Sequence, residues 1–350
     1  MSPTVQSGFN MPTPSRHDWF RFSMRSLLLF TTLVACFLGW VAKERHQSEF
    51  ERQFGEELLK QDNTRVLFLG PYDSLELHGN GEPQGWWRDL ARWALGKRVF
   101  VIYYGGDSVS LTPLAGLKNL ERLSLSETPV SDVTPLVGLT NLKELILRDT
   151  SVSNLTPLNS LESLEELVLV DTPVEDLTPL AKLTKLKGLY VEGTQIHDLE
   201  PLAGLTNLES LVILAMSGGN LTPLTGLKNL KWLTVDGSFA SDLAPLAELT
   251  SLVSLKVTSA AIQDLAPLVE LKDLEYLILA KATASDLTPI GQLRNLKNLT
   301  LSSTSASDLT SLVDLINLSE LRLSGPFINK EQIELLQQSL PNCLIYYGVE

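Results

Sequence analysis

The sequence predicts an α/β solenoid preceded by one transmembrane helix, and three observations carry this prediction. From Leu111 onward, a 22-residue unit recurs ten times without an insertion, and a fixed period of this length is the signature of a solenoid. Each unit pairs a short alternating apolar segment with a turn sequence, which predicts one strand and one helical turn per repeat. Ahead of the repeats, residues 26–42 carry no charge.

The N-terminal part is predicted to anchor the chain in a membrane. Residues 1–25 read as a disordered tail. The 17 uncharged residues 26–42 extend about 26 Å as a helix, at the short end of what spans a hydrocarbon core. Trp19 and Trp40 flank this run, as interfacial aromatics do. We expect a single-pass protein of the cell membrane with an extracytoplasmic C-terminal part, although Lys and Arg on both sides leave the topology undecided.

Two other interpretations of this segment stay open. A cleaved signal peptide needs a small-residue exit site, whereas the run ends near the bulky Trp40 and Val41. Residues 33–36, Leu-Val-Ala-Cys, resemble a bacterial lipobox, in which Cys36 would be lipidated, but apolar residues continue beyond Cys36. We favour an uncleaved anchor in which Cys36 is an ordinary membrane-buried thiol.

Residues 43–64 predict a charged stalk helix, and residues 65–110 predict an N-terminal cap. The cap is expected to contain a strand at residues 65–69, a loop at 78–85, an amphipathic helix with three tryptophans at 86–95, and a strand from Val99 to Tyr103. A solenoid needs such a cover over the open apolar end of its stack. Binding of the tryptophan helix to a membrane surface is the alternative.

The solenoid is assigned to residues 111–324, because the repeat keeps one register throughout them. Its first positions are Leu111, Val133, Leu155, Leu177, Leu199, Leu221, Leu243, Leu265, Leu287 and Leu309. Leu120, Leu123 and Leu125 predict a short strand with inward leucines, and such strands stack in parallel about 4.8 Å apart. One unit cannot bury its own leucines, so neighbouring units stabilise each other.

Two polar features recur at the turns. Thr112-Pro113 and its equivalents predict a Thr N-cap followed by Pro at the first position of a helical turn. Before most of these pairs stands an acidic or amide residue. The members are Asp132, Asn154, Asp176, Asp198, Asn220, Asp242, Asp264, Asp286 and Asp308. A carboxylate ladder could bind calcium, but Asp is also a natural turn residue, and we favour the turn.

The shared pattern L-T-P-L-x-x-L-x-N-L-x-x-L-x-L-x-x-T-x-V-x-D resembles the leucine-rich-repeat family, in its 22-residue bacterial internalin-like class. The resemblance covers about two-thirds of the chain. It implies a right-handed superhelix with a concave parallel sheet and convex helical or 3₁₀ turns. The buried Asn usual in that family is replaced by Thr128, Thr150, Thr172 and Thr194, whose hydroxyls can still satisfy backbone groups.

Some repeats depart from the pattern. Repeat five carries Met216 and Gly218 where other units have Thr and Val. Later repeats carry alanine in the valine column, at Ala240, Ala284 and Ala306. These small residues predict a local change in packing or curvature.

Residues 325–350 are predicted as a C-terminal cap. An amphipathic helix is expected over residues 327–338, followed by a final strand within 340–345. Cys343 is most simply a small buried hydrophobe there.

Composition narrows the function. A net charge of −13 argues against a nucleic-acid partner, because phosphate binding needs a basic surface. The two cysteines, Cys36 and Cys343, are too few for a disulfide framework or a metal cluster. The four histidines are scattered and accompany no nucleophile motif, metal spacing or phosphate loop. We therefore expect no enzyme, cofactor or metal site.

The outward side chains of the strands are the predicted binding surface for a protein or peptide ligand. The face begins charged and becomes apolar and aromatic near its middle, as a binding hot spot does. The candidate residues are Tyr190, Val212, Leu214, Trp232, Asp236, Lys256, Tyr276 and Ile278. Strands also favour such residues without any ligand. The alternative function is a structural or adhesive envelope protein with weak, distributed contacts.

Overall fold

The computed structural model describes the backbone of residues 64–69, 74–78, 99–104, 111–215, 220–258 and 262–348. The chain divides into two units, residues 1–50 and 51–350, and all described residues belong to the second. The predicted tail, transmembrane helix and stalk up to residue 63 therefore lie outside the described residues. Within the described part, every helix is too short or too polar to cross a bilayer.

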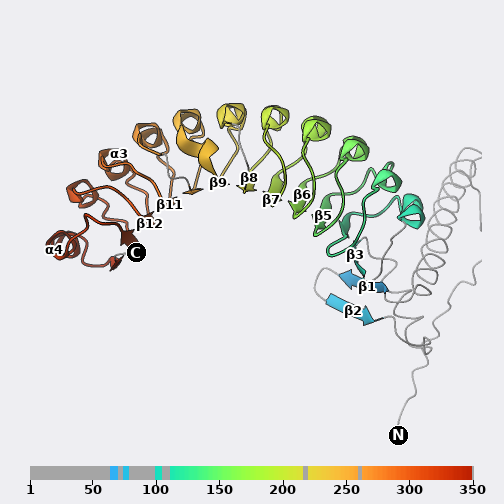
Figure 1. The fold of residues 1–350 in the computed structure, drawn as a ribbon, viewed down its shortest axis with the longest axis horizontal. Helices are drawn as coiled ribbons and strands as arrows, with labels where there is room; N and C mark the ends of the chain where they lie inside the picture. The colour runs from blue at the N-terminus through green and yellow to red at the C-terminus, as the bar shows by residue number, and fades with distance from the viewer. Residues whose placement is uncertain are drawn as a thin grey trace, which may run out of the picture. The chain divides into compact units, whose positions relative to one another are not determined.

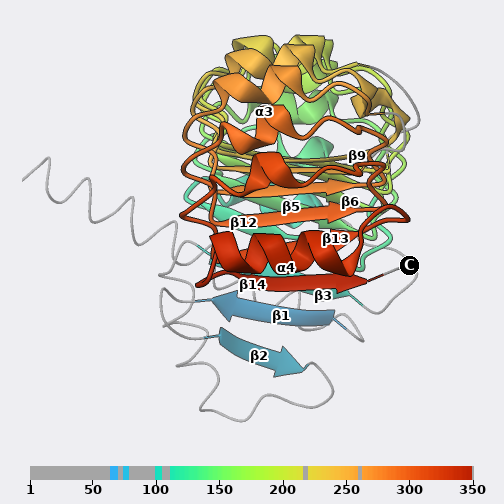
Figure 2. The same cartoon turned by 90° about the vertical axis from the view of Figure 1, so that its left-hand side faces the viewer.

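The described strands form one 14-stranded sheet with the order β14-β13-β12-β11-β10-β9-β8-β7-β6-β5-β4-β3-β1-β2. From β3 to β14 all neighbours are parallel, whereas β1 pairs antiparallel with both β2 and β3 (Figures 1 and 2). The strands before the repeats are β1 (Thr64–Leu69), β2 (Ser74–His78) and β3 (Val99–Tyr104). Those of the repeats and the last cap are β4 (Arg122–Ser124), β5 (Glu144–Arg148), β6 (Glu166–Val170), β7 (Gly188–Glu192), β8 (Ser210–Leu214), β9 (Trp232–Asp236), β10 (Ser254–Thr258), β11 (Tyr276–Ala280), β12 (Asn298–Ser302), β13 (Glu320–Ser324) and β14 (Leu344–Gly348).

Short helices cover the outer side of the arc that the repeats follow, and the strands line the inner side (Figure 1). They are η1 (Thr112–Gly116), η2 (Thr134–Leu136), η3 (Thr156–Ser160), η4 (Thr178–Lys182), η5 (Glu200–Leu202), η6 (Thr222–Gly226), η8 (Ala244–Glu248), η9 (Ala266–Glu270), α3 (Thr288–Gly291) and η10 (Thr310–Leu312). Nearly all of these turns are 3₁₀ and, apart from η10, each has Pro in its first positions. The predicted parallel sheet and convex turns are thus confirmed.

The core is a continuous stack of leucines between these two layers. The leucines of each turn lie in register, and nearly all are less than 3% exposed. In the sixth repeat, for example, Leu224, Leu227 and Leu233 are buried together, with Ala240 in the valine column. Since each strand buries its inward residues against the next turn, the stack propagates along the chain rather than closing on itself.

The convex turns are initiated by the acidic column and not by the threonines. Thr134 and its equivalents are already the first residues of the turns, so the N-cap position falls on Val133, Leu155 and Leu177, whose apolar side chains make no capping bond. Instead, Asp132 Oδ1 accepts from the Thr134 N–H at 2.8 Å, and Asn154 accepts from Thr156 in the same way at 2.9 Å. The predicted Thr N-cap is therefore wrong. The carboxylate or amide two residues earlier closes an Asx turn around the Leu or Val between them.

A second amide column ties five of the turns to the turn before each. Asn141 donates to the Lys118 carbonyl at 2.8 Å, and Asn207 donates to the Thr184 carbonyl at 2.8 Å. Asn229, Asn295 and Asn317 repeat the contact. These bonds satisfy carbonyls left by the short helices, so they explain the Asn in the repeat pattern.

The buried threonine column behaves differently from the prediction. Thr128 donates to the Leu125 carbonyl at 2.6 Å. Thr150, Thr172 and Thr194 are at most 8% exposed, yet their hydroxyls have no hydrogen-bond partner within the part of the chain that the structure describes. The expectation that these hydroxyls satisfy backbone groups holds for Thr128 only.

Both ends of the solenoid carry additional elements outside the repeats. β1 and β3 confirm the strands predicted in the N-terminal cap, β2 was not predicted and includes His78, and the tryptophan helix lies outside the described residues. At the other end, the helix predicted over residues 327–338 is α4 (Lys330–Ser339), which begins later because Asn329 is its N-cap in a capping box with Gln332. The final strand β14 begins only at Leu344, because residues 341–343 form the turn after α4. Cys343 is buried, which raises the pKa of its thiol to about 11.

The predicted departure from regularity appears after β9. An additional 3₁₀ helix, η7 (Ser238–Ser241), forms there, following Gly237 at φ 138°. Ala240 is completely buried at this corner, whereas Ala284 and Ala306 are buried at the equivalent positions of later repeats, where the described residues form no additional helix. Met216 and Gly218 of repeat five lie outside the described residues.

Candidate functional site on the concave face

Alternate residues of every repeat strand point away from the leucine core, and these form columns across the concave face. Two columns pass through the strands in register. The first contains Arg122, Glu144, Glu166, Gly188, Ser210, Trp232, Ser254, Tyr276, Asn298, Glu320 and Leu344. The second contains Ser124, Ile146, Val168, Tyr190, Val212, Thr234, Lys256, Ile278, Thr300, Arg322 and Tyr346. Parallel pairing without a shift keeps equivalent residues adjacent.

The structure places all eight candidate residues on strands β7 to β11. Trp232 is 48% exposed and Tyr276 42% exposed, and both belong to the first column. Lys256 is exposed in the second column. The remaining five are half-buried by their neighbours: Tyr190, Val212, Leu214, Asp236 and Ile278. Val170, which the sequence places on the same face, is instead almost fully buried.

The beginning of the face is charged, and its charges are engaged with one another. Arg122 lies 3.3 Å from Glu144. The pKa of Glu166 is raised, mainly by partial burial and to a lesser extent by repulsion from Glu144 and Glu165. The carboxylate of Glu166 occupies the space where a Cβ on Gly188 would lie, so the missing side chain of β7 makes room for it.

The last strands also pair their charges. Arg322 contacts Glu320 at 2.6 Å and stacks over Tyr346, with 4.9 Å from its guanidinium to the ring centroid. Between the two ends, the phenol of Tyr190 donates to Glu192 at 2.6 Å, and this bond raises the pKa of Tyr190. Lys256, in the middle, has no ion-pair partner among the described residues. Lys256 is therefore a cation available to a ligand, as is Arg148 at the end of β5, for which no ion pair is found among the described residues either.

A second surface feature, which the sequence reasoning missed, runs along the edge where the strands begin. The residue before each of the strands β4 to β9 alternates between Glu and Lys: Glu121, Lys143, Glu165, Lys187, Glu209 and Lys231. Each Lys pairs with the Glu of the preceding repeat, as in Lys187–Glu165 at 2.7 Å and Lys231–Glu209 at 2.6 Å. The signal was a period of 44 residues, two repeats, in one column.

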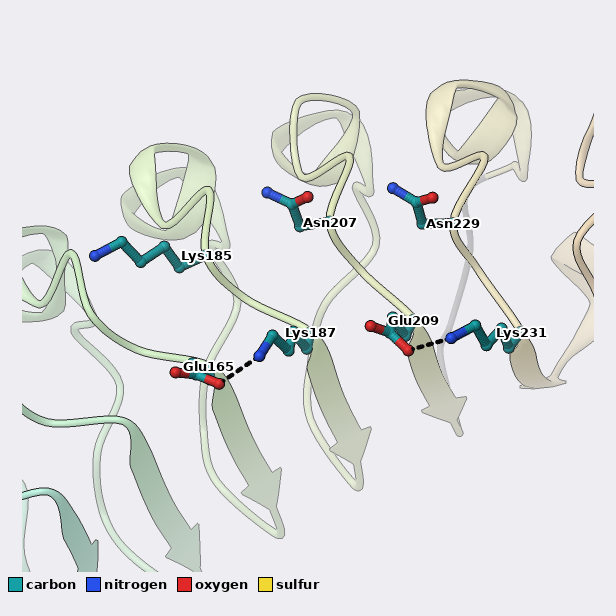
Figure 3. A pocket seen from close by; sticks show the side chains of 7 residues that line it. All are labelled: Glu165, Lys185, Lys187, Asn207, Glu209, Asn229 and Lys231. Atoms are coloured by element: carbon teal, nitrogen blue, oxygen red, sulfur yellow. Dashed lines mark hydrogen bonds and ion pairs between the residues drawn. The ribbon is translucent and has the colours of Figure 1, made fainter.

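This charge ladder borders a hollow of about 440 Å³ between the convex helices and the strand beginnings (Figure 3). Its lining is Glu165, Lys185, Lys187, Asn207, Glu209, Asn229 and Lys231. Most of these groups already have protein partners, because the lysines hold the glutamates and both asparagines hold backbone carbonyls. The groups around the hollow thus mainly hold neighbouring repeats together. The exposed aromatic side chains lie on the concave face beside it.

No family model and no curated protein matches the sequence. Among solved structures, an internalin (inlF) from Listeria monocytogenes is 27% identical, with a TM-score of 0.58 over 71% of this chain and 82% of that chain. The leucine-rich-repeat ectodomain of the Arabidopsis thaliana receptor kinase GASSHO1/SCHENGEN3, solved with CASPARIAN STRIP INTEGRITY FACTOR 2, is 19% identical with a TM-score of 0.52, over 68% of this chain and 34% of that chain. A TLR13–ssRNA13 complex is 23% identical with a TM-score of 0.53, over 68% and 38% of the two chains.

These likenesses establish the fold. The repeats form a leucine-rich-repeat solenoid similar to that of an internalin, as the repeat pattern predicted. The structures less than 25% identical share the architecture alone, and they were solved with ligands of different chemical classes. The ligand class therefore has to be argued from the side chains of this chain's own concave face.

Proposed function

We propose that the chain is a binding protein whose concave face takes a protein or peptide ligand. One observation carries the proposal: Trp232 and Tyr276, both about half exposed, stand on the same column of a rigid parallel sheet. Exposed aromatic anchors surrounded by half-buried apolar side chains are the usual composition of an interface hot spot. The proposal assigns recognition to the face and no reaction.

Charge favours a protein ligand over a nucleic acid. The chain carries a net charge of −13. Of the concave cations, Arg122 and Arg322 are paired with glutamates. Phosphate backbones are held by arrays of free Lys and Arg, which the described strands do not present. The likeness to a structure solved with RNA therefore supports the fold and not the ligand.

Site-specific photocrosslinking tests the proposal. A photoreactive residue replaces Ser210, which neighbours Trp232 on the first column, in the full chain made in its native cells. The matched control replaces Ile316, which is 79% exposed outside the concave face. We expect crosslinks to defined proteins from position 210 alone, and their loss in Trp232→Ala and Tyr276→Ala.

The same experiment separates the alternative function. A structural or adhesive protein with distributed contacts would crosslink equally from both positions, and neither aromatic substitution would change the pattern. That result would refute the proposal, because a hot spot concentrates binding energy in few residues.

We further propose, from the uncharged run 26–42, that the solenoid is tethered to the cell membrane with its C-terminal part outside the cytoplasm. Membrane fractionation of the full chain is the test. We expect the protein to stay with membranes after alkaline carbonate extraction, and deletion of residues 1–45 to release it. Release of the full chain by carbonate would refute the tether.

A further inference from the structure

Trp232 and Tyr276 flank Ser254 on the concave face, and we infer that they form the walls of a slot for an aromatic side chain of an extended peptide whose second following residue is acidic. This inference rests on the proposed binding function and specifies its ligand. The slot consists of Trp232 and Tyr276 as walls, Ser254 as floor, and Lys256 at one end.

The register of the sheet creates the slot. Ser254 of β10 pairs with Trp232 of β9 on one side and with Tyr276 of β11 on the other. Two strand spacings place the Cα atoms of the walls about 9.6 Å apart. One ring inserted between two others makes two ring contacts of about 4.5–7 Å each, about 9–14 Å in all, so the spacing accepts a single aromatic ring. The short Ser254 side chain leaves the space between the walls open.

The outer face of Trp232 is already occupied, which directs its other face toward the slot. Lys231 Nζ lies 5.9 Å from the centroid of the Trp232 ring. The same ammonium is held 2.6 Å from Glu209 of the preceding repeat (Figure 3), so it is drawn toward β8. The charge ladder thus supports Trp232 from behind, and the free face of the ring is the one toward Ser254.

Lys256 determines the charge of the ligand. It follows Ser254 by two residues on β10, about 6.6 Å along a parallel strand. An extended peptide aligned with β10 repeats its side chains at the same interval, so a ring in the slot brings the second following side chain to Lys256. Because Lys256 has no ion-pair partner among the described residues, a carboxylate there completes an ion pair. Asp236, at the next outward position of β9, disfavours a carboxylate placed further along the strand.

Selection from a phage-displayed library of random linear peptides tests the inference. The target is the full chain in mild detergent, compared with Lys256→Glu, Trp232→Ala and, as a matched control, Lys272→Glu. Lys272 is an exposed lysine in the turn before β11, off the concave face. All variants are first checked for unchanged thermal unfolding.

We expect the wild type and Lys272→Glu to enrich peptides with an aromatic residue at one position and Asp or Glu two positions later. Lys256→Glu should select Lys or Arg at that second position, and should bind the wild-type peptides about tenfold more weakly. Trp232→Ala should weaken them at least about tenfold.

Two results would overturn the inference, with different consequences for the proposed function. Peptides that depend on Trp232 but show no charge preference would refute the role of Lys256 and leave concave-face binding intact. Peptides indifferent to both substitutions, or no enrichment, would refute the slot itself, and the crosslinking from position 210 would then decide the proposed function independently.

Discussion

Replacing Thr172 by Val should stabilise the solenoid, whereas the same replacement at Thr128 should destabilise it. Both threonines occupy the same column and are at most 2% exposed. They differ in one contact, since Thr128 donates to the Leu125 carbonyl at 2.6 Å and the Thr172 hydroxyl has no partner among the described residues. The pair therefore isolates the contribution of a single buried hydroxyl.

The magnitudes follow from the general cost of burying a hydroxyl. Without a partner this burial costs about 1–3 kcal/mol, so Thr172→Val should raise the free energy of unfolding by about 1 kcal/mol or more. Thr128→Val removes a hydrogen bond whose net contribution is about 1 kcal/mol and should lower it by that amount. Valine keeps the branched shape, so the packing of the leucines is little changed.

Urea unfolding of the full chain in detergent, followed by circular dichroism at equilibrium, measures both changes. The two variants should shift the midpoint in opposite directions without changing the slope. If Thr172→Val destabilised the protein as much as Thr128→Val, the hydroxyl would have a hydrogen-bond partner, such as a buried water. The assumption of an unsatisfied group would then be wrong.

Three further predictions concern the turns and the core. The pKa of the turn aspartates is lowered by hydrogen bonds from the residue two positions later: Asp132 by Thr134, Asp176 by Thr178, Asp286 by Thr288 and Asp308 by Thr310. A lowered folded-state pKa contributes stability above the unfolded pKa of about 4, and this stability is lost as pH falls through the folded-state pKa. The midpoint temperature of thermal unfolding should therefore fall below about pH 4. Changing all four Asp to Asn, as already at Asn154, should weaken that fall, and it should also lower the midpoint at pH 7, because Asn lacks the charge that contributes the stability there. Ala215 has a left-handed φ of 61° at a position where two neighbouring repeats carry Gly193 and Gly237. Ala215→Gly should therefore raise the unfolding midpoint by the equivalent of up to about 1 kcal/mol, and an unchanged or lower midpoint would count against backbone strain. Leu211→Ala, at a fully buried position of β8, should lower the free energy of unfolding in urea by about 3 kcal/mol. Val137→Ala should lower it little, because Val137 in the second repeat is 49% exposed. Equal losses would mean that burial in the leucine core does not govern stability.

The sequence predicted the repeat strands, the convex turns and the concave columns, because each depends on residues within one 22-residue unit. It misassigned the turn cap to Thr134 and its equivalents, since Thr and the preceding Asp are both good acceptors and only the backbone geometry distinguishes them. It also missed the strand β2 and the start of β14 at Leu344, where no repeat supplies a register. The eight candidate residues do lie on one face, but their role as a ligand site stays a prediction.

What the sequence determined by itself is everything that a periodic apolar pattern dictates: the solenoid, its register, and which side chains face the core. The tertiary structure decided what depends on contacts between neighbouring repeats. Only stacking shows that Lys231 pairs with Glu209 of the preceding repeat and lies near the Trp232 ring. Within a repeat, only the backbone geometry shows that Thr128 finds a partner while Thr172 has none among the described residues. The physical reason is that hydrophobic burial follows a column's average polarity, whereas ion pairs, hydrogen bonds and ring contacts depend on distances of a few ångströms between residues 22 positions apart.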